Sequence, residues 1–282
     1  MEILLFIIFL GLTQGFTEFL PISSSGHLAL FENLPIFQNM KTILEQQYSL
    51  LAFNVILHLG TIMAVIFYWR KDLIQIIRDF FGDLFHKRYG KGMSITMKIG
   101  LTTIPVLCVP FFKHFIDETI HSLSWISLFF ILNGFLLFAG HLIRKKNKNK
   151  PTKDMNEITY WNALVIGIFQ VLAVFPGISR SGSTITAAMF QNVNGESSVK
   201  YSFLISIPVL MGAALFEINN IGFSAVFSPD ARLDWILIGL FFSFVAGLIS
   251  LKILVWLGRK VLFYPFGIYT IFLGITVYAL LG

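Results

Sequence analysis

"GFTEFLPISSSGHLAL" (residues 15–30) places a glutamate, three consecutive serines and a histidine around a proline, directly after an apolar N-terminal run. The 282 residues as a whole are 56% hydrophobic and 13% charged, with a mean hydropathy of +0.76. Soluble domains do not have this composition, so the chain is expected to be an integral membrane protein. A charged side chain at membrane depth costs roughly 2.5–3.5 kcal/mol on insertion scales, so the polar groups of this stretch indicate a function.

Six apolar stretches are long enough to cross a membrane, since a hydrocarbon core of about 30 Å takes roughly 20 helical residues. They lie near residues 49–69, 95–112, 123–143, 200–217, 233–256 and 262–281. Each is continuously apolar and does not alternate with a period of two, which argues against a transmembrane barrel. Cys108 is the only cysteine, which excludes an internal disulfide and a cysteine-based metal cluster. The predicted fold class is therefore all-α, with six transmembrane helices.

Lysine and arginine are concentrated in the loops on one side of the predicted membrane. The basic segments are 70–98, 144–153 and Arg259–Lys260, whereas loops 31–48, 114–122 and 218–232 hold few basic residues and several acids. By the positive-inside rule, the basic segments are cytoplasmic and the acidic loops are outside. The net charge of +6 therefore reflects orientation and contact with anionic lipid, and nucleic acid is not an expected partner.

Residues 1–37 and 158–193 do not fit simple spans. Each contains two helix-like arms joined by a turn rich in Pro, Gly or Ser, and the second arms (27–37 and 183–192) have only about ten residues, or roughly 15 Å of helix. A helix of that length reaches about half-way through a bilayer. Both regions are therefore predicted to be re-entrant hairpins, which a membrane tolerates where the irregular backbone is buried in protein or lines a polar cavity.

The two hairpins resemble each other in sequence. "GLTQGFTEFLPISSSG" from Gly11 and "GIFQVLAVFPGISRSG" from Gly167 align without a gap. The matched pairs are Gly11/Gly167, Gln14/Gln170, Phe19/Phe175, Ile22/Ile178, Ser23/Ser179, Ser25/Ser181 and Gly26/Gly182. Three spans follow each hairpin, and three is odd, so the second half is predicted to enter the membrane from the opposite side as an inverted repeat. Chance similarity between Gly/Ser turns is the alternative.

This division gives three parts: residues 1–143 as a first repeat, 144–157 as a basic cytoplasmic linker, and 158–282 as a second, inverted repeat. Each repeat holds one hairpin and three spans. The two hairpins then enter from opposite faces, and their tips are expected to meet near the membrane midplane.

The tips would bring chemically complementary groups together. Gln14 and Glu18 are four residues apart and share one helical face. The turns add the first-tip residues Ser23, Ser24, Ser25 and His27 and the second-tip residues Ser179, Arg180, Ser181, Ser183 and Thr184. The starts of the short second arms favour anions, and the arginine offers a planar fork of donors. The predicted site therefore suits phosphate.

Simpler roles remain open for several of these residues. Glu18 and Arg180 could form a purely structural ion pair, and His27 could be a helix cap or a satisfied core residue. Hydroxyls in re-entrant loops often only satisfy backbone groups. The remaining candidates, which we expect to be structural or interfacial, are His58, His114, His121, His141, Glu217 and Lys252.

With "FLPISSSGH" (19–27), "PGISRSGST" (176–184) and a Gln–Glu pair at positions 14 and 18, the chain resembles the bacterial undecaprenyl-diphosphatase family, also called bacitracin-resistance proteins. The match in motif spacing and span order covers nearly the whole chain. The resemblance implies removal of the terminal phosphate from the lipid carrier undecaprenyl diphosphate, which regenerates the monophosphate for peptidoglycan synthesis. It also implies a divalent cation and an active site that faces the outside of the bacterial inner (plasma) membrane.

Carried over to this sequence, the resemblance implies that Glu18, His27 and Arg180 are essential and that Gln14, Ser24 and Ser179 assist. Position 14 is glutamine where many members have glutamate, which leaves one anionic ligand fewer and weakens the case for Gln14 as a metal ligand.

The expected reaction is hydrolysis of a phosphoanhydride, in which positioning and charge neutralisation matter more than covalent chemistry. Glu18 would hold Mg²⁺ or Ca²⁺, which prefer oxygen ligands. His27 would act as a base on water or on Ser24, or as the nucleophile itself. The phosphates would be held by Arg180 and the turn residues Ser23, Ser25, Gly26, Ser179, Ser181 and Thr184.

A secondary transporter or flippase for a phosphorylated polyprenyl lipid or another anion is the alternative, because inverted repeats with broken helices are also a transporter architecture. The expected partners are the membrane, a polyprenyl diphosphate lipid and a second copy of the chain in a homodimer.

Overall fold

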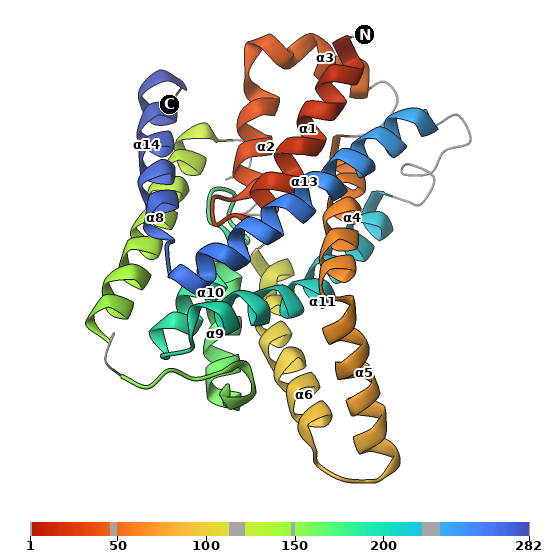
Figure 1. Ribbon diagram of the computed structural model, residues 1–282. Coiled ribbons are helices and arrows are strands. Elements are labelled where there is room, and N and C mark those ends of the chain that lie inside the picture. Colours follow the sequence, from red (N-terminus) through yellow and green to blue (C-terminus); the bar gives the residue numbers. More distant parts are fainter. Residues whose placement is uncertain (1, 46–49, 113–121, 148–149, 222–231, 282) are drawn as a thin grey trace.

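The computed structural model describes residues 2–45, 50–112, 122–147, 150–221 and 232–281 (Figure 1). These residues are almost entirely helical, and the only β pairing among them is one isolated bridge between Lys153 and Val193. The predicted all-α class is confirmed. The first-half helices are α1 (Glu2–Phe19), α2 (Ser24–Asn33), η1 (Pro35–Phe37), α3 (Gln38–Glu45), α4 (Leu50–Tyr68), α5 (Arg70–Phe85), α6 (Lys91–Thr103), η2 (Ile104–Phe112) and α8 (Leu123–Lys146). The second-half helices are η3 (Met155–Glu157), α9 (Tyr160–Leu172), α10 (Arg180–Phe190), α11 (Gly195–Ile221), α13 (Leu233–Lys260) and α14 (Tyr264–Leu281).

Several of these helices are long and apolar enough to cross a membrane. Within the described ranges there are five, or up to six when α4 and α5, which meet at an angle of 74°, are taken as one span. Four of the five coincide with predicted spans, namely α6 with η2, α8, α11 and α13. The fifth is α1, which the sequence suggested only as a hairpin arm; its 18 residues are long enough to cross. The protein is therefore a multi-pass membrane protein.

Small residues let the central helices approach closely. A Cβ atom added at Gly15 of α1 would lie 2.5 Å from both Ala246 Cβ and Ser243 O on α13, so no larger side chain fits this crossing. Helices α1 and α4 both pack against α13, and α8 pairs with α14 (Figure 1). Membrane helices commonly pack through such small residues, since lipid tails provide no hydrophobic driving force between helices.

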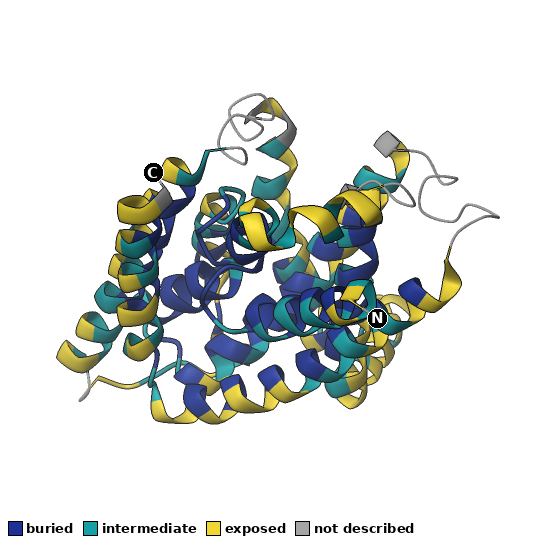
Figure 2. Ribbon diagram, turned by 90° about the horizontal axis from the view of Figure 1, so that it is seen from above, coloured by how far each residue is buried: buried dark blue, intermediate teal, exposed yellow. Residues whose placement is uncertain are grey.

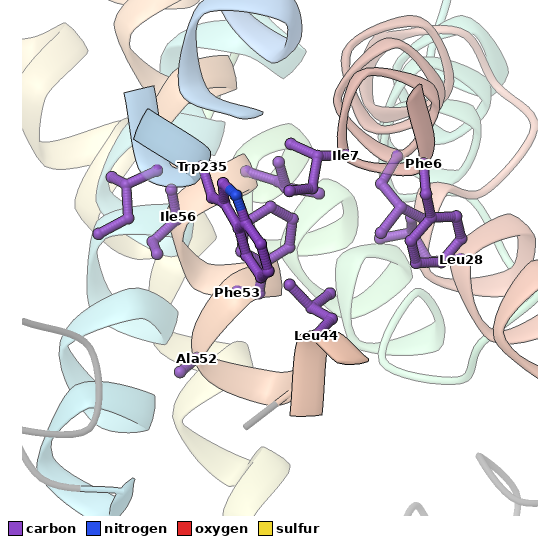
Figure 3. Packing of buried hydrophobic residues seen from close by; sticks show 11 residues of the cluster. Phe6, Ile7, Leu28, Leu44, Ala52, Phe53, Ile56 and Trp235 are labelled. Carbon is purple, nitrogen blue, oxygen red and sulfur yellow. The ribbon is translucent and has the colours of Figure 1, made fainter. Parts of the chain in front are cut away.

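One apolar cluster joins α1, α2, α3, α4 and α13 at the end of the molecule where the chain begins. Figure 3 shows its buried side chains, among them Phe6 from α1, Phe53 from α4 and Trp235 from α13. This packing fixes α1 against α4. It therefore also fixes the polar residues that follow along both helices.

Burial follows the pattern expected in lipid. Buried residues gather in the centre, and exposed ones line the periphery (Figure 2). Large apolar side chains are exposed on the outer faces, for example Phe135 (60%) and Phe272 (71%), where lipid would cover them. Polar residues are buried in the interior, including Gln14, Glu18 and Ser179. Because a buried polar group needs partners, these interior contacts define the site.

Two helical hairpins, α1–α2 and α9–α10, reach this interior. Their second arms, α2 and α10, have 10 and 11 residues, which confirms the predicted short arms. Asn133 of α8 joins the two tips, since its Nδ2 donates to Pro21 O at 3.0 Å and its Oδ1 accepts from Ser179 N at 2.9 Å. The tips therefore meet, as expected from the sequence.

Candidate active site

The two short helices begin in the same way. At the start of α2, Ser23 Oγ accepts a hydrogen bond from Gly26 N at 3.3 Å; at the start of α10, Ser179 Oγ accepts one from Gly182 N at 3.1 Å. Both contacts are N-caps, and the four residues are two of the pairs matched in the sequence. The two helix N-termini, which favour anions, therefore both start at the junction of the tips.

The tips are in direct contact. Gly177 N donates to Ser23 Oγ at 3.0 Å, and a Cβ atom added at Gly26 would lie 2.8 Å from Gly177 N. Gly177 has φ +106°, and Ser23 has φ 69°, which is unfavourable for a residue other than glycine. The surrounding contacts must hold Ser23 in this conformation, and such strain is typical of functional sites.

Glu18 is the centre of the polar contacts. Arg180 Nη2 donates to its Oε1 at 2.9 Å, and the Glu18 side chain is only 5% exposed. Its Oε2 accepts from Ser24 Oγ at 2.6 Å and from Gln14 Nε2 at 3.1 Å, and it lies 3.7 Å from His58 Nε2. The structure thus brings together Gln14, Glu18, Ser24 and Arg180, all of which were predicted from the sequence.

A cavity of about 210 Å³ opens at this cluster. Its polar lining consists of Glu18, Ser23, Ser24, Ser25, His58, Gln170, Ser179 and Arg180, and its apolar lining of Val106, Ala173, Val174, Ile178, Val209 and Leu210. Arg180 uses its guanidinium for Glu18 and for a 3.4 Å contact with Ser202 O. An arginine has five N–H donors, so further donors remain for a ligand. The cavity can hold a phosphorylated headgroup beside an apolar chain.

Other predicted site residues lie behind the cavity and support it. Gly26 donates to the Ser23 cap, and Ser181 Oγ contacts Ser179 Oγ at 3.0 Å. Thr184 Oγ1 donates to Arg180 O at 2.9 Å and contacts Ser202 Oγ at 2.6 Å. These residues hold the tips in place and do not line the cavity, so the direct phosphate contact expected for Gly26, Ser181 and Thr184 is not what the geometry favours.

His27 differs most from its expected place. Its Nδ1 bonds to Ser23 O at 2.7 Å, its Nε2 bonds to Tyr269 OH at 2.8 Å, and the ring is 3% exposed. It stacks on the Tyr269 ring and does not line the cavity. Both nitrogens are occupied by structural partners, so the geometry favours the satisfied-core role for His27 over the expected role as base or nucleophile.

His58 and Gln170 are the residues that sequence reasoning passed over. His58 was expected to be structural, yet it lines the cavity with Nε2 toward Glu18. Its Nδ1 bonds to the carbonyl oxygen of Asn54 at 2.8 Å, so Nδ1 carries a proton and the ring orientation is fixed. The sequence feature that could have identified His58 is its position inside an apolar span, where an ionisable residue indicates a function. The feature that could have identified Gln170 is its alignment with Gln14. His114 and His121 lie outside the described residues.

The polar cluster around Glu18 offers oxygen atoms that could contact a divalent cation. No three His, Cys, Asp or Glu side chains lie together within the described part of the chain. Gln14 Oε1 and Gln170 Oε1 are, however, buried oxygens without a hydrogen-bond partner, beside the Glu18 carboxylate and on the cavity wall respectively. Mg²⁺ is commonly bound by one or two carboxylates together with substrate phosphates. The residues fit a cation that the substrate itself helps to hold.

Comparison with known proteins extends over the whole chain. The family model described as "Bacitracin resistance protein BacA" matches residues 7–276. The chain is 34% identical over 278 residues to the undecaprenyl-diphosphatase of Halothermothrix orenii, covering 98% of this chain and 97% of the relative. It is 40% identical over 248 residues to that of Thermosipho africanus, with 88% of each chain covered, and 36% identical over 243 residues to that of Methanococcus maripaludis strain C7, with 86% of each covered.

Proposed function

The chain belongs to the bacitracin resistance protein BacA family, and from this membership we propose that it removes the terminal phosphate of undecaprenyl diphosphate, giving undecaprenyl phosphate and inorganic phosphate. The reaction recycles the lipid carrier of cell-wall synthesis. Its relatives carry the name of this hydrolase, and none of the comparisons favours the transporter alternative.

One observation carries the assignment of the reacting groups. Ser24 Oγ donates to Glu18 Oε2 at 2.6 Å while Arg180 donates to the other oxygen of the same carboxylate. A hydroxyl bonded to a base that is oriented by a third group is the arrangement of an activated nucleophile. Arg180 and the N-termini of α2 and α10 supply the positive potential that a diphosphate needs.

The reaction then proceeds in two steps. Ser24 Oγ attacks the terminal phosphorus, its proton passes to Glu18, and the bond between this phosphorus and the bridging oxygen breaks, which releases undecaprenyl phosphate. Water then attacks the phosphoserine, inorganic phosphate leaves, and Ser24 recovers its proton. His58 lies close enough to Glu18 to contact the phosphoryl oxygens through Nε2.

We propose Glu18, with Gln14 Oε1, as the chain's ligands for Mg²⁺ or Ca²⁺, the remaining ligands coming from the diphosphate. Such a cation, when bound, neutralises charge on the phosphate oxygens. Arg180, the Ser179 hydroxyl and the helix N-termini orient the diphosphate. The apolar wall, which includes Val174, Val209 and Leu210, excludes water and continues toward the lipid tail.

We also propose how the protein is oriented in the membrane. The basic residues of α5 and of the turn before α6, together with those of segment 144–153, support a cytoplasmic location for these segments by the positive-inside rule. The active-site cavity is proposed to open to the outside of the bacterial plasma membrane. Pairing of two copies in a homodimer remains a prediction.

Phosphate release by purified protein supplied with undecaprenyl diphosphate tests the function. Wild type should release phosphate and form the monophosphate, and S24A should lose both. S25A is the matched control, since Ser25 lines the cavity without a hydrogen bond to Glu18, and it should keep most activity. Absence of phosphate release from wild type contradicts the function, and equal activity of S24A and S25A contradicts the nucleophile.

A further inference from the structure

A second cavity, of about 320 Å³, lies where α6 begins. Its lining includes Tyr89, Lys91, Ser94, Lys98 and Asn156. Lys91, Ser94 and Lys98 are spaced by three and four residues on one helix, so they share one face. Asn156 belongs to η3, which precedes α9. This cavity shares no residue with the lining of the candidate active site.

Lys98 is the feature that the fold does not explain. The residue is 7% exposed, and within the described ranges its ammonium group makes no ion pair or hydrogen bond. The ammonium group lies over the Tyr160 ring, with 5.7 Å between Nζ and the ring centroid. Burying a charge without a partner costs free energy. Lysine is therefore rarely buried in proteins unless its charge is paired.

The acids near this cavity are already engaged. Asp83 lies beside Gly90, but its carboxylate accepts from Arg88 Nε at 2.9 Å and from Met93 N at 3.0 Å. Glu157, next to Asn156, accepts from Asp154 N at 2.7 Å. Asp83 is paired with Arg88, and neither acid pairs with Lys91 or Lys98 within the described ranges, so both lysine charges remain available to an anionic ligand.

We propose that this cavity binds a phosphate group, held by Lys98 and Lys91 with the Ser94 hydroxyl and the Asn156 amide. The site is separate from the candidate active site and does not depend on its chemistry. A membrane-length helical stretch starts at Lys91, so the cavity lies at the level of lipid headgroups on the basic side. The phosphate therefore comes from a phosphomonoester lipid or from free inorganic phosphate.

Ligand-dependent stability of the full-length protein tests this site, because a ligand that binds only the folded state raises the melting temperature. One arm titrates inorganic phosphate into protein in neutral detergent at constant ionic strength. The other compares micelles containing phosphatidic acid with micelles of phosphatidylcholine. Both arms use wild type, K98M and the matched control K252M, whose lysine is exposed on α13.

We expect wild type and K252M to be stabilised and the apparent Kd of K98M to rise by about tenfold or more, as for loss of a charge-assisted hydrogen bond. A response in the phosphate arm identifies free phosphate, and a response confined to phosphatidic acid identifies a lipid headgroup. Equal stabilisation of K98M and wild type, or no stabilisation in either arm, overturns the proposal. K91M, which alters an exposed side chain, should also raise the apparent Kd. This variant replaces K98M in the test if K98M does not fold.

Discussion

Arg180 Nη2 and Glu18 Oε1 lie 2.9 Å apart, although 162 residues separate them in the chain. This ion pair joins the tips of two hairpins from different halves of the molecule. Both side chains are largely buried, with exposed fractions of 11% and 5%, so the pair is shielded from water. Breaking one member of such a pair leaves an uncompensated charge, which makes the position a sensitive test of the site.

Lysine at position 180 should not replace arginine. It keeps the charge but loses the planar fork that can bond Glu18 and a phosphate together. We expect R180K to lose about 100-fold or more in kcat/KM, as for removal of a transition-state donor. Phosphate release by purified protein measures this, with the melting temperature as a check on folding. Near-wild-type turnover would leave Arg180 as a structural counter-ion only.

The two polar residues of α1 should respond differently to exchange. A hard cation needs the Glu18 charge, whereas Gln14 contributes a neutral oxygen. E18Q should abolish metal-dependent hydrolysis, and Q14E should be tolerated and lower the metal concentration for half-maximal rate. Phosphate release against Mg²⁺ or Ca²⁺ concentration after chelation measures both. If E18Q keeps its metal dependence, Glu18 is not the metal ligand.

Substitution of His58 should affect mainly activity, whereas substitution of His27 should affect mainly stability. H58Q removes an imidazole from the cavity wall and should lower kcat by about tenfold, as for loss of one hydrogen bond that stabilises the transition state by about 1.4 kcal/mol, with little change in melting temperature. H27A removes buried hydrogen bonds to Ser23 and Tyr269 and should destabilise by roughly 1–3 kcal/mol. Y269F is the control for His27 and should be destabilised in the same direction. The reverse pattern would restore His27 as the reacting group.

Orientation can be read from thiol accessibility. In a Cys108→Ser background, a cysteine introduced at exposed Asn39 of α3 should react with an impermeant reagent in intact cells. One introduced at exposed Lys146, at the end of α8, should react only after the membrane is opened. Labelling of position 146 but not of 39 in intact cells would reverse the topology. Equal labelling of both positions would place them on the same side and remove the basis for the inverted repeat.

Acid should loosen the α5–α6 hairpin. Hydrogen bonding from Met93 N, together with Arg88, holds the pKa of Asp83 below its ordinary value of 3.8. The ionised carboxylate is therefore the stabilising form: its contribution is complete above the ordinary pKa and is lost as the pH falls through the folded value. Amide protection factors around residues 83–94, taken relative to the intrinsic exchange rate at each pH, should fall with acid in wild type, and D83N should already have lower protection at neutral pH. Identical exchange in both proteins would contradict this role.

Much of the site could be predicted because its signals are local. The repeated Ser–x–x–Gly spacing fixes the caps of α2 and α10, and the short arms follow from where the apolar runs end. The place of His27 depends on Tyr269, which reaches it from α14, and no local pattern shows such a contact. The same holds for His58, which meets Glu18 only because α1 and α4 share a packed core.

The length of α1 and the number of spans were less predictable. A hydrophobic run shows that a helix can cross, but the turn at residues 20–23 that ends α1 could be placed at several depths. The alignment of the halves pairs Ser23 with Ser179, the two residues that cap α2 and α10 in the structure. It does not by itself determine how the two halves are oriented, because that depends on packing between distant helices.

The joint between the two tips has a consequence for how the protein is made. Glu18 has no guanidinium partner until residue 180 has been synthesised and inserted, and at about 5–20 residues per second the interval is on the order of ten seconds. During this time the first hairpin carries a carboxylate that the apolar membrane interior disfavours. Until residue 180 arrives, the carboxylate can be stabilised only by Gln14, Ser24 and His58 of its own half, so an incomplete chain lacks the arginine that the proposed reaction requires.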